Sequence, residues 1–372
     1  MSMSYRKWLQ QKIVNLQNID CYSVGATPET VAKQIGISPS AIIKLNFNES
    51  LFVDRSAQAR LMKELVDEFD LRLYPEDEVP DFLVKLSGYI GAPENYLTVG
   101  NGSDELIDRI VRLFVEEGEV MLSFAPTFSI PKLCMKRQKG EYVTVPLKSN
   151  LQLDVEALMA QFSDKTRLLY LCSPNNPTST QFNQEDVEKL TKAFPGIVIL
   201  DEAYGEFANY SLVPRISEFS NMIILRTFSK AFGLAALRLG YAVANPEITK
   251  VITEKAPLPY PVSGFTLRMG SKMLDNVDLM KKAAKELIAE RGKLIKALNK
   301  INGVQAFDSQ ADFLLMNTSK SADEVNEKLL QKGIMLKKWG RILQYPNCFR
   351  VTVGLPEMNR KLIVALKEIQ SD

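Results

Sequence analysis

The strongest constraint on the fold is a series of short apolar runs along the middle of the chain. They are EVMLS, EYVTV, RLLYLCS, IVILDEA, MIILRT and LGYAVA, between residues 119 and 244. Most of them are separated by segments long enough for a helix. Near-continuous apolar strands that alternate with helices are typical of a mainly parallel sheet covered by helices on both faces. We therefore predict an α/β fold, and a length of 372 residues leaves room for a second, smaller domain.

The flanking segments predict how the two domains divide the chain. Helical patterns cover 54–69, 80–90 and 102–115 before and among the first strands. Past Pro261 the pattern changes to a long charged helix at 276–300, followed by short strands and two further helices. We predict a large domain of residues 51–265. A smaller α+β domain would be formed by residues 1–50 and 266–372.

Composition excludes several classes of function. The net charge of +2 gives no field that would favour nucleic acid, and no apolar run is long enough to span a membrane. The N-terminal segment lacks the apolar stretch of a secretory signal. The four cysteines are far apart, with neither metal-ligand spacing nor a disulfide framework. We expect a cytoplasmic protein without a metal site.

The chain contains no histidine. This excludes Ser-His-Asp and Cys-His catalysis and the HExxH type of zinc site. Proton transfer must then use Lys, Tyr, Asp, Glu or Cys.

Four loops at strand ends carry candidate chemistry, because ligands of open α/β sheets bind outside the carboxyl ends of the strands. In GNGSDE, Gly102, Ser103 and Asp104 open a helix whose N–H groups can bind phosphate. In CSPNNPT, a stiff loop can aim the amide of Asn176 at a ligand oxygen. Taken alone, each stretch is more typical of a plain turn.

The other two loops carry ionisable groups. Asp201 ends an apolar strand in ILDEAYGEF, so its carboxylate needs a cation or several hydrogen bonds, and Tyr204 follows three residues later. In RTFSKAFGLAALRLG, Lys230 follows another strand together with hydroxyl groups and Arg238. The alternatives are a structural ion pair for Asp201, a surface position for Lys230 and a salt bridge for Arg238.

Together, the four loops fit one ligand, pyridoxal 5′-phosphate. An amine such as Lys230 forms a Schiff base with its aldehyde. A buried Asp201 keeps its ring nitrogen protonated, so that the ring can accept electrons from a substrate. Thr227, Ser229 and Arg238 neutralise its phosphate.

The same motifs carry a family resemblance. From KLNFNE through YPE, GNGSDELI, APTF, CSPNNPT, DEAY and TFSKAFGLAALRLG to CFRVTVG, the chain resembles the fold-type-I pyridoxal-phosphate aminotransferases, and among them the histidinol-phosphate aminotransferase family. The resemblance implies amino transfer from L-histidinol phosphate to 2-oxoglutarate, giving imidazole acetol phosphate and L-glutamate in histidine biosynthesis.

The resemblance also implies roles for single residues. Lys230 looks like the Schiff-base lysine that moves a proton at the substrate Cα, and Asp201 like the partner of the ring nitrogen. Asn176 and Tyr204 are similar to the pair that holds the ring 3′-oxygen, and Phe128 to the aromatic residue that stacks on the ring.

Further roles concern the substrate and a second subunit. Tyr74 of LYPE resembles a tyrosine that reaches the phosphate of the neighbouring subunit, which implies a homodimer with shared active sites. Arg350 of CFRVTVG resembles the arginine that binds the anionic group of the substrate. Tyr22 and Tyr260 are further expected substrate contacts, as is Asn176.

The chain departs from the family pattern at three positions. Ser179 stands where the family has the glycine of PNNPTG, and Phe128 where it often has tyrosine. Lys337 stands where the family often has an arginine that helps to hold the substrate phosphate. Lysine keeps the positive charge but lacks the bidentate fork of arginine.

Several other functions remain open at this point. An aromatic amino-acid aminotransferase and a decarboxylase of a phosphorylated amino acid share much of this motif set. A noncatalytic effector-binding module would not need both Lys230 and Asp201. An NAD-dependent dehydrogenase would be expected to carry GxGxxG, which is absent from the sequence.

Overall fold

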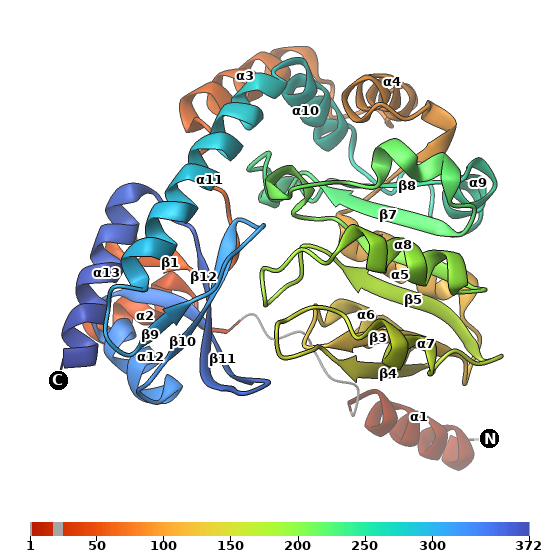
Figure 1. Ribbon diagram of the computed structural model, residues 1–372. Helices are drawn as coiled ribbons and strands as arrows, with labels where there is room; N and C mark the ends of the chain where they lie inside the picture. Colours follow the sequence, from red (N-terminus) through yellow and green to blue (C-terminus); the bar gives the residue numbers. More distant parts are fainter. Residues whose placement is uncertain (1, 18–24, 372) are drawn as a thin grey trace.

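The computed structural model describes residues 2–17 and 25–371. Within these residues, two sheets lie side by side (Figure 1). No helix among these residues is long and apolar enough to cross a lipid bilayer.

The larger sheet contains, among the described residues, seven strands in the order β2-β8-β7-β6-β5-β3-β4. Its strands are β2 (Leu97–Gly100), β3 (Val120–Ala125), β4 (Glu141–Pro146), β5 (Thr166–Cys172), β6 (Ile197–Asp201), β7 (Met222–Thr227) and β8 (Gly240–Ala244). The strands from β3 to β7 pair in parallel, whereas β8 runs antiparallel to both β2 and β7. The prediction of a mainly parallel sheet is confirmed.

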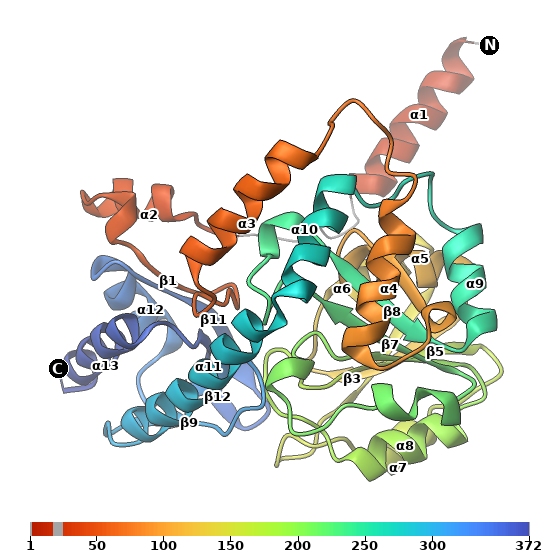
Figure 2. The same ribbon diagram turned by 90° about the horizontal axis from the view of Figure 1, so that it is seen from above.

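Helices cover both faces of this sheet. Figure 2 shows α5 (Ser103–Phe114) and α6 (Ile130–Arg137) on one side, with α7 (Val155–Met159) and α8 (Gln184–Ala193) on the other. The central strands β5, β6 and β7 are almost wholly buried, as expected for a sheet covered on both faces. The outer helices of this domain are α3 (Arg55–Glu68), α4 (Glu78–Ile90), α9 (Pro246–Lys255) and α10 (Gly264–Asp275).

The smaller sheet has the order β1-β11-β12-β10-β9 within the described part of the chain. Its strands are β1 (Ile43–Leu45), β9 (Val304–Ala306), β10 (Phe313–Thr318), β11 (Ile334–Ile342) and β12 (Tyr345–Thr352). It packs with α2 (Pro28–Ile35), α11 (Val277–Leu298), α12 (Ala322–Gln331) and α13 (Pro356–Ser371). β1 pairs in parallel with β11, so an N-terminal segment completes this C-terminal sheet.

Two features differ from the simple division at residue 265. That boundary falls inside α10, whose buried residues belong to the same core as the larger sheet. In addition, α1 (Ser2–Gln17) lies apart from the smaller sheet in both views (Figures 1 and 2). The assignment of residues 1–50 to the small domain therefore describes β1 and α2, but not α1. The long α11 connects the two parts.

Candidate functional site

A cavity is lined by the last residues of β5, β6 and β7, at the carboxyl ends of the parallel strands. These strand ends point toward the smaller sheet (Figure 1). Most of the predicted site residues contribute to its wall. Its lining residues are Phe47, Asn48, Ser103, Asp104, Phe128, Cys172, Asn176, Asp201, Ala203, Tyr204, Thr227, Ser229, Lys230, Arg238 and Arg350. They come from segments that are far apart in the sequence, and the sheet brings them together.

Asp201 is the last residue of β6 and is buried. Its two carboxylate oxygens are hydrogen-bonded: Tyr170 donates to Oδ2 at 2.6 Å, and the Ala203 amide to Oδ1 at 3.1 Å. Burial raises the pKa of Asp201 to about 6, and the two hydrogen bonds act in the opposite direction. The two hydrogen bonds therefore hold the Asp201 carboxylate in one orientation, and burial together with these bonds determines its pKa.

Lys230 reaches the same cavity from the loop after β7. Its Nζ donates to the main-chain oxygens of Phe47 at 3.4 Å and Asn48 at 3.2 Å. Burial lowers the pKa of the Lys230 amine. An amine that loses its proton more easily is a better nucleophile toward an aldehyde. The main-chain oxygens that hold this lysine thus belong to the segment directly after β1.

One end of the cavity is built to receive an anion. Helix α5 begins after Gly102, which has a φ of 81° and gives the helix no side-chain cap. Arg238 lies beside this helix start, with Nη1 3.2 Å from Ser229 Oγ and Nη2 3.3 Å from the Asp104 carboxylate. A Cβ at Gly240 would lie 2.5 Å from the Ser103 amide nitrogen. Uncapped helix N–H groups beside an arginine and a hydroxyl are suited to a phosphate group.

The phenol of Tyr204 is the meeting point of two amides. Tyr204 accepts hydrogen bonds from Asn48 Nδ2 at 3.0 Å and from Asn176 Nδ2 at 3.4 Å. Phe128 lies in the same cavity wall. Tyr204 and Asn176 were expected to act as a pair, and the structure places them in contact.

Arg350 connects the smaller sheet to this cavity from β12. Its Nη1 donates to Asn176 Oδ1 at 2.7 Å, and its Nη2 to the Asn46 main-chain oxygen at 2.6 Å. Lys337 on β11 is paired with Arg350 in the antiparallel ladder, so the two side chains lie on the same face of the sheet. Lys337 is half-buried and does not line the cavity itself.

Two of the three predicted tyrosine contacts lie outside the cavity wall. Tyr74 is 75% exposed and stacks on Tyr260, with 5.0 Å between the ring centroids. Neither residue lines the cavity of its own chain. Tyr22 falls outside the described residues.

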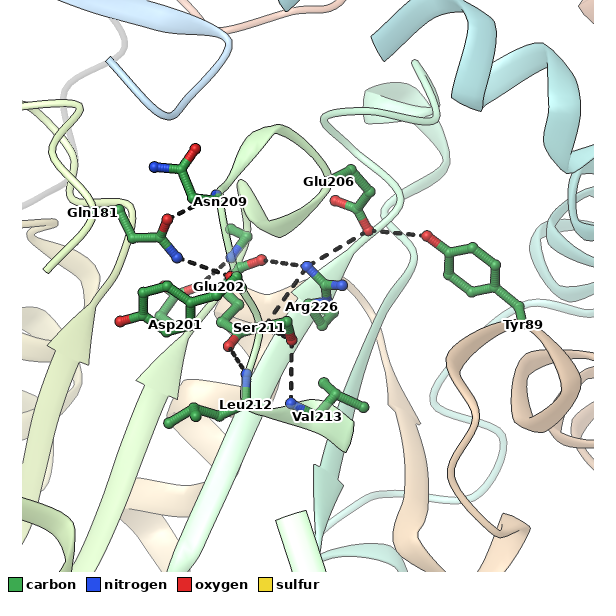
Figure 3. Close-up of polar contacts among 12 residues, drawn as sticks. Tyr89, Gln181, Asp201, Glu202, Glu206, Asn209, Ser211, Leu212, Val213 and Arg226 are labelled. Carbon is green, nitrogen blue, oxygen red and sulfur yellow. Dashed lines mark hydrogen bonds and ion pairs between the residues drawn. The ribbon is translucent and has the colours of Figure 1, made fainter. Parts of the chain in front are cut away.

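A buried ionic cluster of Glu202, Glu206 and Arg226 lies next to Asp201 (Figure 3). Glu202, next to Asp201, accepts hydrogen bonds from the Ser211 hydroxyl and from the Leu212 amide. Arg226 lies 3.7 Å from Glu202 and 3.8 Å from Glu206. Arg226 directly precedes Thr227, so this cluster ties the end of β7 to the turn that carries Asp201 and Tyr204.

Sequence reasoning missed several residues that shape the site. Tyr170 lies in an apolar run that predicts only a strand, although its phenol donates a hydrogen bond to Asp201 Oδ2. Asn48 was noted only within a family motif. A polar group within an otherwise apolar run was the available signal for Tyr170, but nothing in the sequence showed which partner it would meet.

Comparison with known proteins identifies the family of this chain. The sequence model of the family described as "Aminotransferase class I and II" matches residues 40–366. The chain belongs to this family, in its histidinol-phosphate aminotransferase branch.

Two curated relatives carry that name. The histidinol-phosphate aminotransferase of Caldanaerobacter subterraneus subsp. tengcongensis is 34% identical over 88% of this chain and 93% of its own length. That of Methanosarcina mazei is 32% identical over 100% of this chain and 99% of its own length. The relatives therefore correspond to this chain over almost their whole lengths.

A solved structure shows the same fold. The histidinol-phosphate aminotransferase of Sinorhizobium meliloti, solved in complex with pyridoxal 5′-phosphate, superimposes with a TM-score of 0.85. The two proteins are 24% identical, and the match covers 96% of each chain. A threonine-phosphate decarboxylase from Porphyromonas gingivalis shares the fold at a TM-score of 0.76 and 20% identity.

The residues of the cavity fit pyridoxal 5′-phosphate. The uncapped start of α5 and Arg238 would hold its phosphate, Asp201 its ring nitrogen, and Lys230 its aldehyde carbon. Glycines at 102 and 240 keep the phosphate end open: a Cβ at Gly102 would lie 2.8 Å from Arg238 Nη2.

Proposed function

We propose that this protein is a homodimeric pyridoxal-phosphate aminotransferase that transfers the amino group of L-histidinol phosphate to 2-oxoglutarate. The observation that carries the proposal is the meeting of Lys230, Asp201 and Arg350 in one cavity, one end of which is lined by Ser103, Ser229 and Arg238 and is suited to a phosphate. Family membership over nearly the whole chain supports the same conclusion.

The cofactor supplies an electron sink for the pair released at the substrate Cα. The protein supplies the rest. Asp201 keeps a proton on the ring nitrogen, and Tyr170 and the Ala203 amide fix its orientation. Lys230 is the base that moves the proton at Cα, because its amine lies in the cavity and burial lowers its pKa. Tyr204 and Asn176, which are in contact in the cavity wall, would hold the ring oxygen of the cofactor.

The substrate end must bind two different anions in turn. Histidinol phosphate carries a phosphate ester and no α-carboxylate, whereas 2-oxoglutarate carries carboxylates. Arg350 suits both, because its planar fork matches either anion. The dianionic phosphate favours a second cation, and Lys337 lies opposite Arg350 on the neighbouring strand. We assign Lys337 to the phosphorylated donor.

The test compares kcat/KM for histidinol phosphate, phenylalanine and 2-oxoglutarate in wild type and Lys337→Ala. Loss of one charged hydrogen bond, roughly 1.5–3 kcal/mol, should lower kcat/KM for histidinol phosphate about 10- to 150-fold and leave the other two nearly unchanged. Lys338→Ala is the matched control, because Lys338 is exposed and pairs with Asp323 instead.

An aromatic aminotransferase is the second candidate, because Lys337 lacks the arginine fork. In that case phenylalanine would be the better donor in wild type, and Lys337→Ala would be silent. Release of carbon dioxide from a phosphorylated amino acid would instead identify a decarboxylase.

A homodimer with shared active sites is part of the proposal. Tyr74 stands on an exposed apolar stretch with Leu71 and Leu73, and Leu258 is exposed in the segment before Tyr260. Large exposed apolar surfaces mark sites of protein association. In the proposed dimer, Tyr74 reaches the phosphate end of the partner's cavity, which explains why it does not line its own.

A cytoplasmic location completes the proposal. Among the described residues, Cys134, Cys172 and Cys348 are buried free thiols, which suits a reducing compartment. The partners are then a small-molecule amino donor and a 2-oxo acid acceptor.

A further inference from the structure

Asp312 is a buried carboxylate to which the reaction above gives no role. It lies just before β10, on the segment that links β9 to β10, and its exposed fraction is 0%. Within the described part of the chain, neither of its carboxylate oxygens has a hydrogen-bond partner. A buried carboxylate without hydrogen bonds is costly, so its charge has to be balanced by cations that lie nearby.

Packing fixes Asp312 between several elements. Its main-chain oxygen accepts from the Val353 amide at 2.9 Å, just beyond β12. Arg291 of α11 donates to the neighbouring Ala311 oxygen at 2.7 Å. The next residue is Phe313. The centroid of its ring lies 5.0 Å from the centroid of the Tyr204 ring and 5.6 Å from Cζ of Arg350.

The charged groups around Asp312 are those of the active site. Its carboxylate is stabilised by the positive charges of Lys230 and Arg350, and also of Arg291. Burial raises the pKa of the Tyr204 phenol, and the negative charge of Asp312 raises it further. The negative charge of Asp312 therefore interacts with the positive charge of Arg350, the residue to which we assign the substrate anion.

A second anion at Arg350 would compete with Asp312 for the same positive charge. We propose that Asp312 takes up a proton from solvent when an anionic substrate binds to Arg350, so that substrate binding is linked to protonation. The inference rests on the proposed function, which places the substrate anion at Arg350. Charge and protons balance in this step. Asp312 takes one proton from solvent and becomes a neutral carboxylic acid, and the negative charge of the substrate replaces that of Asp312.

The sign of the pH effect follows from burial. Burial raises the pKa of Asp312 to about 7, and a neighbouring anion raises it further. Below that pH the group is already protonated and binding takes up no proton from it. Above it, each binding event must draw a proton from water, so affinity for the anion falls as pH rises.

Calorimetric titration of the holoenzyme with 2-oxoglutarate tests the inference. This ligand has no amino group to give to the aldehyde form of the cofactor, so it binds without turnover. Titrations at pH 7.5 in two buffers of different ionisation enthalpy give the protons taken up per site. Cofactor absorbance in the same samples gives the share that belongs to the cofactor and Lys230.

Wild type should take up roughly half a proton or more per site beyond the share seen in the cofactor absorbance, as expected for a group with a pKa near 7 that rises on binding. In Asp312→Asn, which keeps the shape and removes the charge, this excess should vanish. In wild type, the dissociation constant of 2-oxoglutarate should rise above pH 7, and in Asp312→Asn this rise should be absent. Asp308→Asn removes an exposed carboxylate from the same segment and should behave as wild type.

Two results would overturn the inference alone: binding without excess uptake in wild type, or the same excess in Asp312→Asn. The first needs no variant, so a folding defect cannot hide the answer. If 2-oxoglutarate does not bind to wild type at all, the assignment of the acceptor site fails, and this inference fails with it.

Discussion

At the scale of single residues, Asp201 and Asp312 are two buried carboxylates with different hydrogen bonding and therefore different tendencies to take up a proton. Asp201 accepts two hydrogen bonds, whereas Asp312 accepts none on its carboxylate within the described residues. Hydrogen bonds favour the ionised form, and burial without them favours the neutral form. Asp201 is therefore suited to a permanent charge next to a ring nitrogen, and Asp312 to a charge that changes.

Asp201→Asn tests the first of these roles. The amide cannot hold a protonated ring nitrogen, so we expect normal folding and cofactor binding but a loss of kcat of about 10- to 150-fold, from roughly 1.5–3 kcal/mol for a charged hydrogen bond. Tyr170→Phe removes the hydroxyl that orients Asp201 and should lower kcat less. Near-normal turnover in Asp201→Asn would mean that the ring nitrogen lies elsewhere.

Asp312 also predicts how stability depends on pH. Its pKa is about 7 in the folded protein against 3.8 for the unconstrained group. The folded state then binds the proton more tightly than the unfolded state, so stability falls as pH rises between these values. Over that range, Asp312 should cost the cofactor-free protein about 4 kcal/mol. Urea unfolding from pH 4 to pH 7.5 should show this loss in wild type relative to Asp312→Asn, and parallel curves would contradict it.

At the scale of elements, the turn after β6 depends on the side chain of Arg226. A Cβ at Gly205 would lie 1.3 Å from Arg226 Nη1, and the guanidinium cannot move away without leaving Glu202 and Glu206 (Figure 3). Gly205→Ala should therefore destabilise the protein by roughly 1–3 kcal/mol. It should also weaken cofactor binding, because the displaced turn carries Asp201 and Tyr204.

Gly292→Ala is the control for this prediction. Gly292 lies within α11, and a Cβ there would meet no atom within 4 Å. Alanine should raise stability by roughly 0.5–1 kcal/mol, since glycine is the poorer helix former. Thermal unfolding of both variants checks the pair, and a neutral Gly205→Ala would show that the ionic cluster tolerates displacement.

At the scale of the whole molecule, the active site is a product of two domains and, in our proposal, of two subunits. Tyr74→Phe and Lys230→Ala chains should each be impaired alone, because one lacks a phosphate contact and the other the catalytic amine. Mixing them should restore part of the activity, since a hybrid dimer contains one site in which neither change occurs. A fully active monomer at nanomolar concentration, seen by sedimentation, would exclude the shared site.

The sequence by itself determined the strands and the chemistry at their ends. Apolar runs such as MIILRT and IVILDEA became β7 and β6 because burial on both faces demands apolar side chains at every position. Three charged residues could be singled out, Asp201, Lys230 and Arg238. A charge at the end of a core strand is costly unless it is paired, hydrogen-bonded or used in binding. Their convergence followed from the rule for parallel sheets.

Only the tertiary structure decided which distant side chains meet. Tyr170 reaches Asp201 across neighbouring strands, and Asn48 reaches Tyr204 across 156 positions of sequence. Asp312 of the smaller domain interacts electrostatically with Lys230 and Arg350 only because the fold brings these two residues together in one cavity. Sequence periodicity reports whether a side chain is buried but not what it is buried against, because partners are fixed by long-range packing and not by local conformation.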